Sequence, residues 1–195
     1  MKRIMITGFS GFVGRHFLEF LYGEGLSYEV LGADIKEPDL DFSRYAPTLG
    51  VRFEKLDMLD RDALQQVVRE FRPDYVLHLA AFSSVAYSWK YPSACFDNNT
   101  KIFLNLTDAL RAEQLDCRVL SVGSSEEYGD VAEDELPLTE GRPLNPVSPY
   151  AVARVAQEMM SKVLVNGFGM KIILTRSFNH IGPYQDERFV IPGFI

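Results

Sequence analysis

The chain has 195 residues, of which 47% are hydrophobic and 24% charged, and its formal net charge is −7. This composition is typical of a soluble globular protein with one domain. The acidic balance, with no basic run longer than Lys2-Arg3, excludes a nucleic-acid surface, because neutralising phosphates requires clustered Lys and Arg. No apolar run reaches the roughly 18 residues of a membrane span. The first apolar run also ends at Thr7, too early for a signal peptide, so we expect a cytoplasmic protein.

Strand-like and helix-like segments alternate along the chain. Short β-type segments predict strands at 4–6, 28–33, 51–56, 75–79, 118–122 and 171–175. Apolar residues at helical spacing predict helices at 12–21, 61–71, 92–114 and 150–165, the last preceded by a polar loop at 130–149. This succession predicts an α/β fold in which a doubly wound parallel sheet (a Rossmann fold) is connected by right-handed crossovers.

A glycine-rich segment, GFSGFVG, lies between the first predicted strand and the first predicted helix. Gly8 permits a sharp turn, Gly11 lets a pyrophosphate approach the backbone, and Gly14 lets the helix pack closely on the sheet. The N–H groups of the first helical turn, which includes Phe12 and Val13, then face the negative charge. A glycine turn alone is weak evidence, but the flanking strand and helix are the context that this mechanism requires. The segment therefore predicts a dinucleotide phosphate site.

Asp34 ends the second predicted strand, 20 positions after Gly14. A carboxylate at this place can accept both ribose hydroxyls of the adenosine half and would repel a 2′-phosphate. Asp34 therefore favours NAD over NADP, although nearby Lys36 would soften the preference. The alternative is an ordinary turn residue at the end of a strand.

The Gly-x-x-Gly-x-x-Gly spacing resembles that of the extended short-chain dehydrogenase/reductase family, the NAD-dependent epimerases and dehydratases. Further segments resemble the family in the same order: Asp57-Met58, His78-Leu79-Ala80-Ala81, Asn98-Asn99-Thr100 and Ser148-Pro149-Tyr150. The resemblance covers the whole chain and implies an NAD(P) cofactor. Besides the glycine turn and Asp34, it implies cofactor contacts from Asp57, Met58, Leu79, Ala80, Ala81, Asn99, Tyr150 and Arg154.

Within the family, the segments at 8–16 and 177–183 resemble the GDP-4-keto-6-deoxy-mannose reductases. The segment at 123–129, GSSEEYG, is similar both to these and to the GDP-mannose 4,6-dehydratases. The resemblance implies a GDP-linked 6-deoxy-4-keto-hexose as substrate and a homodimer formed through the two long helices. It also implies a C-terminal substrate-binding lobe, most of which this chain lacks, so we expect a fragment.

Reduction of a ketone requires a proton at the developing oxyanion, and Tyr150 is the candidate general acid. Ser124, at the end of the fifth predicted strand, would hydrogen-bond the same carbonyl oxygen. A phenol, with a pKa near ~10, needs a neighbouring cation to work at neutral pH. The family pattern is Tyr-x-x-x-Lys, whereas this sequence has Arg154, one helical turn after Tyr150. Either Arg154 supplies the positive charge, with reduced activity, or it is a solvated residue of a weakened or inactive enzyme.

Glu126 could be the acid/base of a 4,6-dehydratase or could only bind the sugar of a reductase. We expect substrate contacts from Ser83, Ser84, Ser125, Glu126 and Asn179. His78 lies in an apolar strand and is expected to be a hydrogen-bonded core residue, and no metal site is predicted. The leading hypothesis is a reductase of a GDP-linked 4-keto-6-deoxy sugar. The alternatives are a 4,6-dehydratase, a 4-epimerase, or a dinucleotide-binding module without turnover.

Overall fold

The computed structural model of the protein describes residues 1–187. These residues form a six-stranded parallel sheet with the order β3-β2-β1-β4-β5-β6. The strands are β1 (Lys2–Thr7), β2 (Tyr28–Asp34), β3 (Leu49–Lys55), β4 (Tyr75–His78), β5 (Arg118–Ser124) and β6 (Lys171–Ser177). The chain winds outward from β1 to β3 and then returns to the centre at β4. The predicted doubly wound Rossmann sheet is therefore confirmed.

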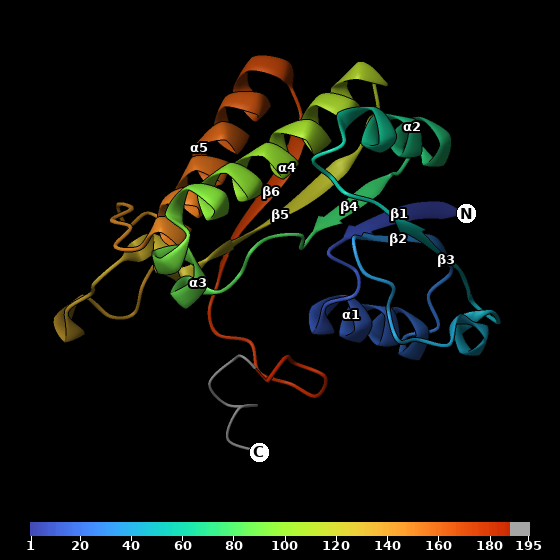
Figure 1. The fold of residues 1–195 in the computed structure, drawn as a ribbon, viewed down its shortest axis with the longest axis horizontal. Helices are drawn as coiled ribbons and strands as arrows, with labels where there is room; N and C mark the ends of the chain where they lie inside the picture. The colour runs from blue at the N-terminus through green and yellow to red at the C-terminus, as the bar shows by residue number, and fades with distance from the viewer. Residues whose placement is uncertain (188–195) are drawn as a thin grey trace.

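Helices cover both faces of the sheet (Figure 1). One face carries α1 (Phe12–Gly23) and the short η1 (Phe42–Tyr45). The other face carries α2 (Arg61–Phe71), α4 (Pro92–Ala112) and α5 (Pro149–Phe168). No helix within residues 1–187 combines the length and the apolar character needed to cross a lipid bilayer.

The alternation of side chains along the central strands builds a separate core on each face. Met5 of β1 packs with Leu106 of α4 on one face. Its neighbours Ile4 and Ile6 pack with Leu18 of α1 on the other. Because successive side chains of a strand point to opposite faces, a strand covered on both sides must be apolar throughout. This requirement explains the continuous apolar runs by which the strands were predicted.

The differences from prediction lie between the main elements. The segment after β4, for which the sequence predicted no helix, contains α3 (Val85–Lys90). Ser84 caps this helix by accepting a hydrogen bond from the Tyr87 N–H at 3.1 Å. A helix of six residues is too short to show a repeating apolar pattern. Two further turns of 3-10 helix, η2 (Ser125–Tyr128) and η3 (Glu133–Glu135), follow β5.

Candidate functional site

The carboxyl ends of β1 and β4 meet where the winding direction of the sheet reverses. Gly8 follows β1 with a φ of +68°, and a Cβ at this position would lie 2.6 Å from the backbone nitrogen of Ala80, just after β4. The Ala80 N–H also donates to the Thr7 Oγ1 at 3.3 Å. Only glycine fits this turn, because it tolerates the positive φ and has no side chain. Two segments predicted to contact the cofactor therefore lie side by side at the place where open α/β sheets bind ligands.

The amino end of α1 is open toward this edge of the sheet. Its N-cap residue is Gly11, so no side chain caps the helix, and its first turn contains no acidic residue. The N–H groups of Phe12, Val13 and Gly14 belong to the first turn, which has no intrahelical acceptors. A Cβ at Gly14 would lie 2.5 Å from the Phe9 carbonyl oxygen, so the helix starts close against the turn. A pyrophosphate fits this end of the helix because free N–H groups and the positive end of the helix dipole face it.

Asp34 is fixed beside the glycine turn. Its Oδ2 accepts a hydrogen bond from the Ser10 N–H at 3.0 Å, and its Oδ1 accepts from the Lys36 N–H at 3.2 Å. The side chain of Lys36 is exposed. Each carboxylate oxygen keeps lone-pair capacity for a further donor, such as a ribose hydroxyl. Asp34 thus links the end of β2 to the glycine turn through Ser10, while its bond to the Lys36 N–H is the Asx turn of a strand-end residue.

Asp57 and Met58 lie next to the end of β2, because the Leu56 N–H donates to the Asp34 carbonyl oxygen at 2.8 Å. Met58 is buried, and Asp57 is exposed and accepts a hydrogen bond from the Leu59 N–H at 2.9 Å. Both predicted adenine-side residues are therefore at the carboxyl edge of the sheet.

Asn99 and Ser84 have structural partners that the sequence did not indicate. Asn99 is 1% exposed, its Oδ1 accepts from the Phe82 N–H at 2.8 Å, and its Nδ2 donates to the Phe82 carbonyl oxygen at 3.1 Å. These bonds hold the segment after Ala81 in place, and the cofactor contact of Asn99 stays a prediction. The Ser84 hydroxyl accepts from the first turn of α3, whereas Ser83 is exposed.

Ser124 ends β5 and begins the η2 turn. Its Oγ accepts from the Glu126 N–H at 3.2 Å, and its own N–H donates to the Glu127 Oε1 at 2.7 Å. Ser124, Ser125 and Glu126 are all half-buried, and α5 contacts this turn. The Ser124 hydroxyl proton is left to donate to another acceptor, as a carbonyl-binding residue requires.

Tyr150 and Arg154 lie inside the protein, between α5 and β5. Their exposed fractions are 7% and 5%, and the Arg154 Nε–H donates to the Tyr150 hydroxyl oxygen at 3.1 Å. Arg154 Nη1 also donates to the Val122 carbonyl oxygen at 3.1 Å and to the Gln157 Oε1 at 3.0 Å. The alternative in which Arg154 is a solvated helix residue is therefore wrong. Its position one turn after Tyr150 places it on the face of α5 that packs against the sheet.

His78 is a neutral core residue, as predicted. It is fully buried, and its Nδ1 lies 2.8 Å from the Thr7 Oγ1. Burial, together with the nearby positive charge of Arg154, lowers the pKa of His78 to about 3. His78 therefore adds no positive charge next to Tyr150 and Arg154.

A buried pair of carboxyl groups at the η2 turn was not predicted from the sequence. Glu127 is fully buried, and Glu158 of α5 is 5% exposed. Glu158 accepts hydrogen bonds from Arg176 at 2.8 and 2.9 Å and from Lys162 at 2.7 Å. The Arg176 hydrogen bonds, assisted by Lys162, lower the pKa of Glu158 to about 2, whereas burial raises the pKa of Glu127 to about 7. Glu127 therefore carries its proton at mildly acidic pH and supports the backbone of Ser124.

The segment after β6 crosses from the β5–β6 side of the sheet to α1 (Figure 1). The His16 Nε2 lies 3.1 Å from the Pro183 carbonyl oxygen, and the Arg15 guanidinium lies 3.5 Å from the centre of the Tyr184 ring. Asn179 lies in the exposed stretch between β6 and these contacts. The segment thus links the two halves of the site.

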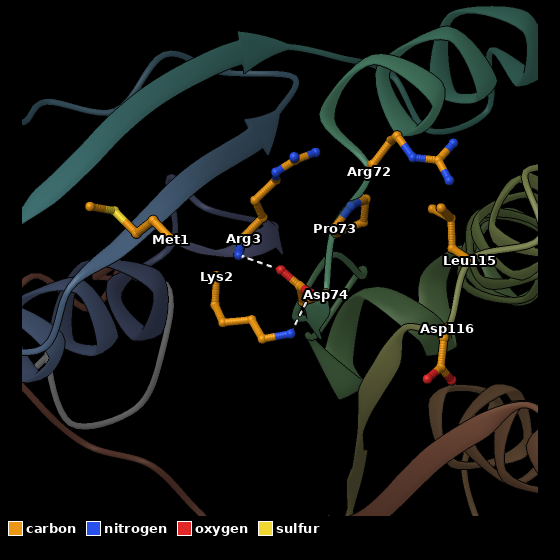
Figure 2. Close-up of a pocket in the computed structure, with 8 residues that line it drawn as sticks. All are labelled: Met1, Lys2, Arg3, Arg72, Pro73, Asp74, Leu115 and Asp116. Carbon is orange, nitrogen blue, oxygen red and sulfur yellow. Dashed lines mark hydrogen bonds and ion pairs between the residues drawn. The ribbon is translucent and has the colours of Figure 1, made fainter.

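A hollow lies at the amino edge of the sheet, opposite the predicted site residues (Figure 2). It is lined by Met1, Lys2, Arg3, Arg72, Pro73, Asp74, Leu115 and Asp116. Lys2 pairs with Asp74 at 2.8 Å, and the Arg3 N–H donates to the same carboxylate at 2.8 Å. None of the predicted site residues lines this hollow. Within residues 1–187, no three His, Cys, Asp or Glu side chains are grouped so as to hold a metal ion.

Comparison with known proteins agrees with this geometry. The sequence model of the NAD dependent epimerase/dehydratase family matches residues 4–195. GDP-6-deoxy-D-mannose reductase of Pseudomonas aeruginosa is 32% identical over 190 residues, which are 97% of this chain and 56% of that protein. Other relatives are named as GDP-mannose 4,6-dehydratase and dTDP-glucose 4,6-dehydratase. The predicted resemblance to the GDP-mannose branch is therefore confirmed.

Solved structures share the fold and include cofactor complexes. The protein named RMD from Pseudomonas aeruginosa, complexed with NADPH, has a TM-score of 0.80 and 31% identity over 99% of this chain and 59% of its own. UDP-glucose 4-epimerase of Thermus thermophilus, complexed with NAD, has a TM-score of 0.79 and 33% identity over 95% of this chain and 58% of its own. The chain thus spans a little more than half the length of these relatives.

Proposed function

The chain belongs to the NAD dependent epimerase/dehydratase family, and from this premise we propose that it carries the cofactor site and the proton donor of a nucleotide-sugar reductase. The proposed substrate is a GDP-linked 6-deoxy-4-keto-hexose, and the proposed reaction reduces its 4-keto group. The observation that carries the proposal is the buried contact between the Arg154 Nε–H and the Tyr150 hydroxyl beside the end of β5. The 32% identity to a GDP-6-deoxy-D-mannose reductase supports this choice of substrate.

The cofactor would lie across the carboxyl edge of the sheet. Its pyrophosphate would bind the open end of α1, its adenosine ribose would bind Asp34, and its adenine would lie near Asp57 and Met58. When bound, the nicotinamide ring supplies the hydride for the reduction. Relatives of known structure hold NAD or NADPH, and we propose NAD for this chain because the fixed Asp34 carboxylate would repel a 2′-phosphate.

The chain's own residues account for the proton. Tyr150 would donate its phenolic proton to the substrate oxygen that gains negative charge, while the Ser124 hydroxyl donates a hydrogen bond to the same oxygen. The Arg154 Nε–H donates to the Tyr150 oxygen and would stabilise the phenolate that remains. Because a guanidinium stays protonated at working pH, Arg154 acts as a fixed positive charge and does not transfer the proton itself.

Glu126 favours a second candidate, a 4,6-dehydratase. It is half-buried and follows Ser124 by two residues in the η2 turn, where a carboxyl group could remove a proton from the sugar ring and protonate a leaving hydroxyl. In the reductase, Glu126 would bind the sugar together with Ser125, Ser83, Ser84 and Asn179.

Cofactor balance distinguishes these functions. The full-length protein would be mixed with reduced cofactor and the GDP-linked 4-keto-6-deoxy sugar, and absorbance of the reduced nicotinamide followed. A reductase consumes one equivalent of reduced cofactor for each sugar, whereas a dehydratase acting on GDP-mannose returns its cofactor with no net change. Saturable cofactor binding without turnover of either sugar would instead identify a binding module.

We also propose a homodimer formed through α4 and α5, which lie next to each other on one face of the sheet (Figure 1). The two helices expose the large apolar side chains of Phe96, Val152, Met159, Val163 and Phe168. Val152, Met159 and Val163 recur at helical spacing and so form an apolar patch on one face of α5, which is typical of an interaction surface. Sedimentation of the parent and of V163D, which places a charge in the patch, tests this: the parent should be a dimer and the variant a monomer.

A further inference from the structure

A chain of buried polar side chains continues beyond Tyr150 and Arg154. Arg154 Nη1 donates to the Gln157 Oε1 at 3.0 Å, and the Gln157 Nε2 donates to the Ser121 Oγ of β5 at 2.8 Å. The exposed fractions of Gln157 and Ser121 are 3% and 1%. The interpretation of the sequence did not use either residue.

The geometry of Arg154 depends on acceptors that lie in different directions. Its Nε–H points to Tyr150, while Nη1 is held between the Val122 carbonyl of the strand and Gln157 on the next turn of α5. A guanidinium is planar, so fixing Nη1 also fixes the direction of the Nε–H. Without Gln157, a buried donor would lose its acceptor, and the guanidinium would turn to find another.

Gln157 is itself held from the other side. Arg154 can only donate, so it faces the amide oxygen of Gln157, and the amide nitrogen then donates to the Ser121 hydroxyl of β5. Ser121 lies three residues before Ser124 on the same strand. The network therefore ties Tyr150 to the strand that ends at Ser124.

We propose that Gln157, anchored by Ser121, is the positioning residue that aligns Arg154 with Tyr150 and so allows an arginine to work where the family pattern has lysine. This inference rests on the proposed function for its consequence in catalysis. Its geometric part, the alignment of Arg154 by Gln157, does not require substrate.

The geometric part is tested by hydrogen exchange of the Arg154 Nε–H, followed by NMR in the full-length protein without ligand. Q157M keeps the length of the side chain but removes the acceptor, and we expect the exchange of the Arg154 Nε–H to become at least tenfold faster. Q157E keeps an acceptor and should retain slow exchange. S161A is the matched control, because Ser161 is also a fully buried polar residue of α5 but donates only to the Gln157 carbonyl oxygen.

The catalytic part is tested by steady-state kinetics of the same variants. Q157M should lower kcat about tenfold, with the cofactor Kd and the substrate KM within twofold of the parent, and Q157E should restore most of the loss. In an R154M background, Q157M should have no further effect, because its action passes through Arg154. A kcat for Q157M within twofold of the parent, or losses that multiply in the double variant, would overturn the inference.

The two failures can be told apart. If the parent turns over no nucleotide sugar but Q157M still makes exchange of the Arg154 Nε–H faster, the positioning stands and the proposed function is rejected. Turnover by the parent with unchanged exchange in Q157M would reject the positioning alone. If Q157M does not fold, S121A decides the matter, because faster exchange of the Arg154 Nε–H supports the inference and unchanged exchange rejects it.

Discussion

The half of the site built by β1, α1 and β2 differs in construction from the half built by β5 and α5. In the first half, the groups that face the proposed pyrophosphate are backbone N–H groups, and close approach depends on the absence of side chains at Gly8 and Gly14. In the second half, buried side chains hydrogen-bond one another, as Arg154 does with Tyr150 and Gln157. The first half should therefore be sensitive to added atoms, and the second to the removal of single polar groups.

The largest effect is expected in the second half, at the proposed acid. Y150F removes only the hydroxyl and should lower kcat by roughly 10³, within the usual range for general acid catalysis. The cofactor Kd should change less than threefold, because the phosphate site is two strands away. Steady-state kinetics and fluorescence titration check this, with Y128F as control, since Tyr128 is buried but lies outside the proposed chemistry. Near-parental turnover by Y150F would remove Tyr150 from the mechanism.

The first half is tested by adding one methyl group. G8A should lower the free energy of unfolding by about 3 kcal/mol and abolish cofactor binding, because the added Cβ meets the Ala80 backbone at a positive φ. G25A has a positive φ but open space around its Cβ, and G23A has open space in a helix. The Tm from thermal unfolding should therefore be far lower for G8A than for G25A, and lower for G25A than for G23A. Equal Tm values for G8A and G25A would show that the contact with Ala80 does not affect stability.

The buried carboxyl pair gives a pH test of the second half. The pKa of Glu127 is raised to about 7, so the folded state holds this proton more tightly than the unfolded state. Its contribution to stability is complete below pH ~4.5 and is lost as pH rises toward about 7. Glu158 has the opposite sign, because its pKa of about 2 means that its contribution is lost as pH falls below ~4.5.

E127Q separates these contributions. It keeps an acceptor for the Ser124 N–H but cannot ionise. In urea unfolding, the free energy of unfolding of the parent should fall by about 2 kcal/mol between pH 4.5 and 7, and that of E127Q should not. The decline below pH 4.5 should remain in both proteins. An identical slope in parent and variant near neutral pH would assign the proton to another group.

The smallest expected effect is in the first half, at a side chain that acts by charge. D34A should weaken NAD binding about tenfold and leave NADP binding unchanged or stronger, because both the ribose acceptor and the repulsion of a 2′-phosphate are lost. D39A changes the net charge equally at an exposed position and should alter neither. The ratio of the two Kd values is the measurement, and an unchanged ratio would separate Asp34 from cofactor choice.

Much of the fold could be predicted from the sequence, because the central strands of a sheet covered on both faces must be largely apolar. The phosphate turn could also be predicted, since the spacing of its glycines is local. The short helix α3 could not, because six residues show no helical repeat. The structural role of Asn99 could not either, since its partner Phe82 lies 17 residues earlier and across a loop.

The amino-acid sequence by itself determined the alternation of strands and helices, the open amino end of α1, and the presence of a tyrosine and an arginine one helical turn apart. Only the tertiary structure decided that Arg154 is buried, that Gln157 and Ser121 hold it, and that Glu127 meets Glu158. The physical reason is that local patterns report which face of an element is apolar. Which polar groups meet across that face depends on how α5 packs against β5, and the residues concerned lie 31 to 36 positions apart.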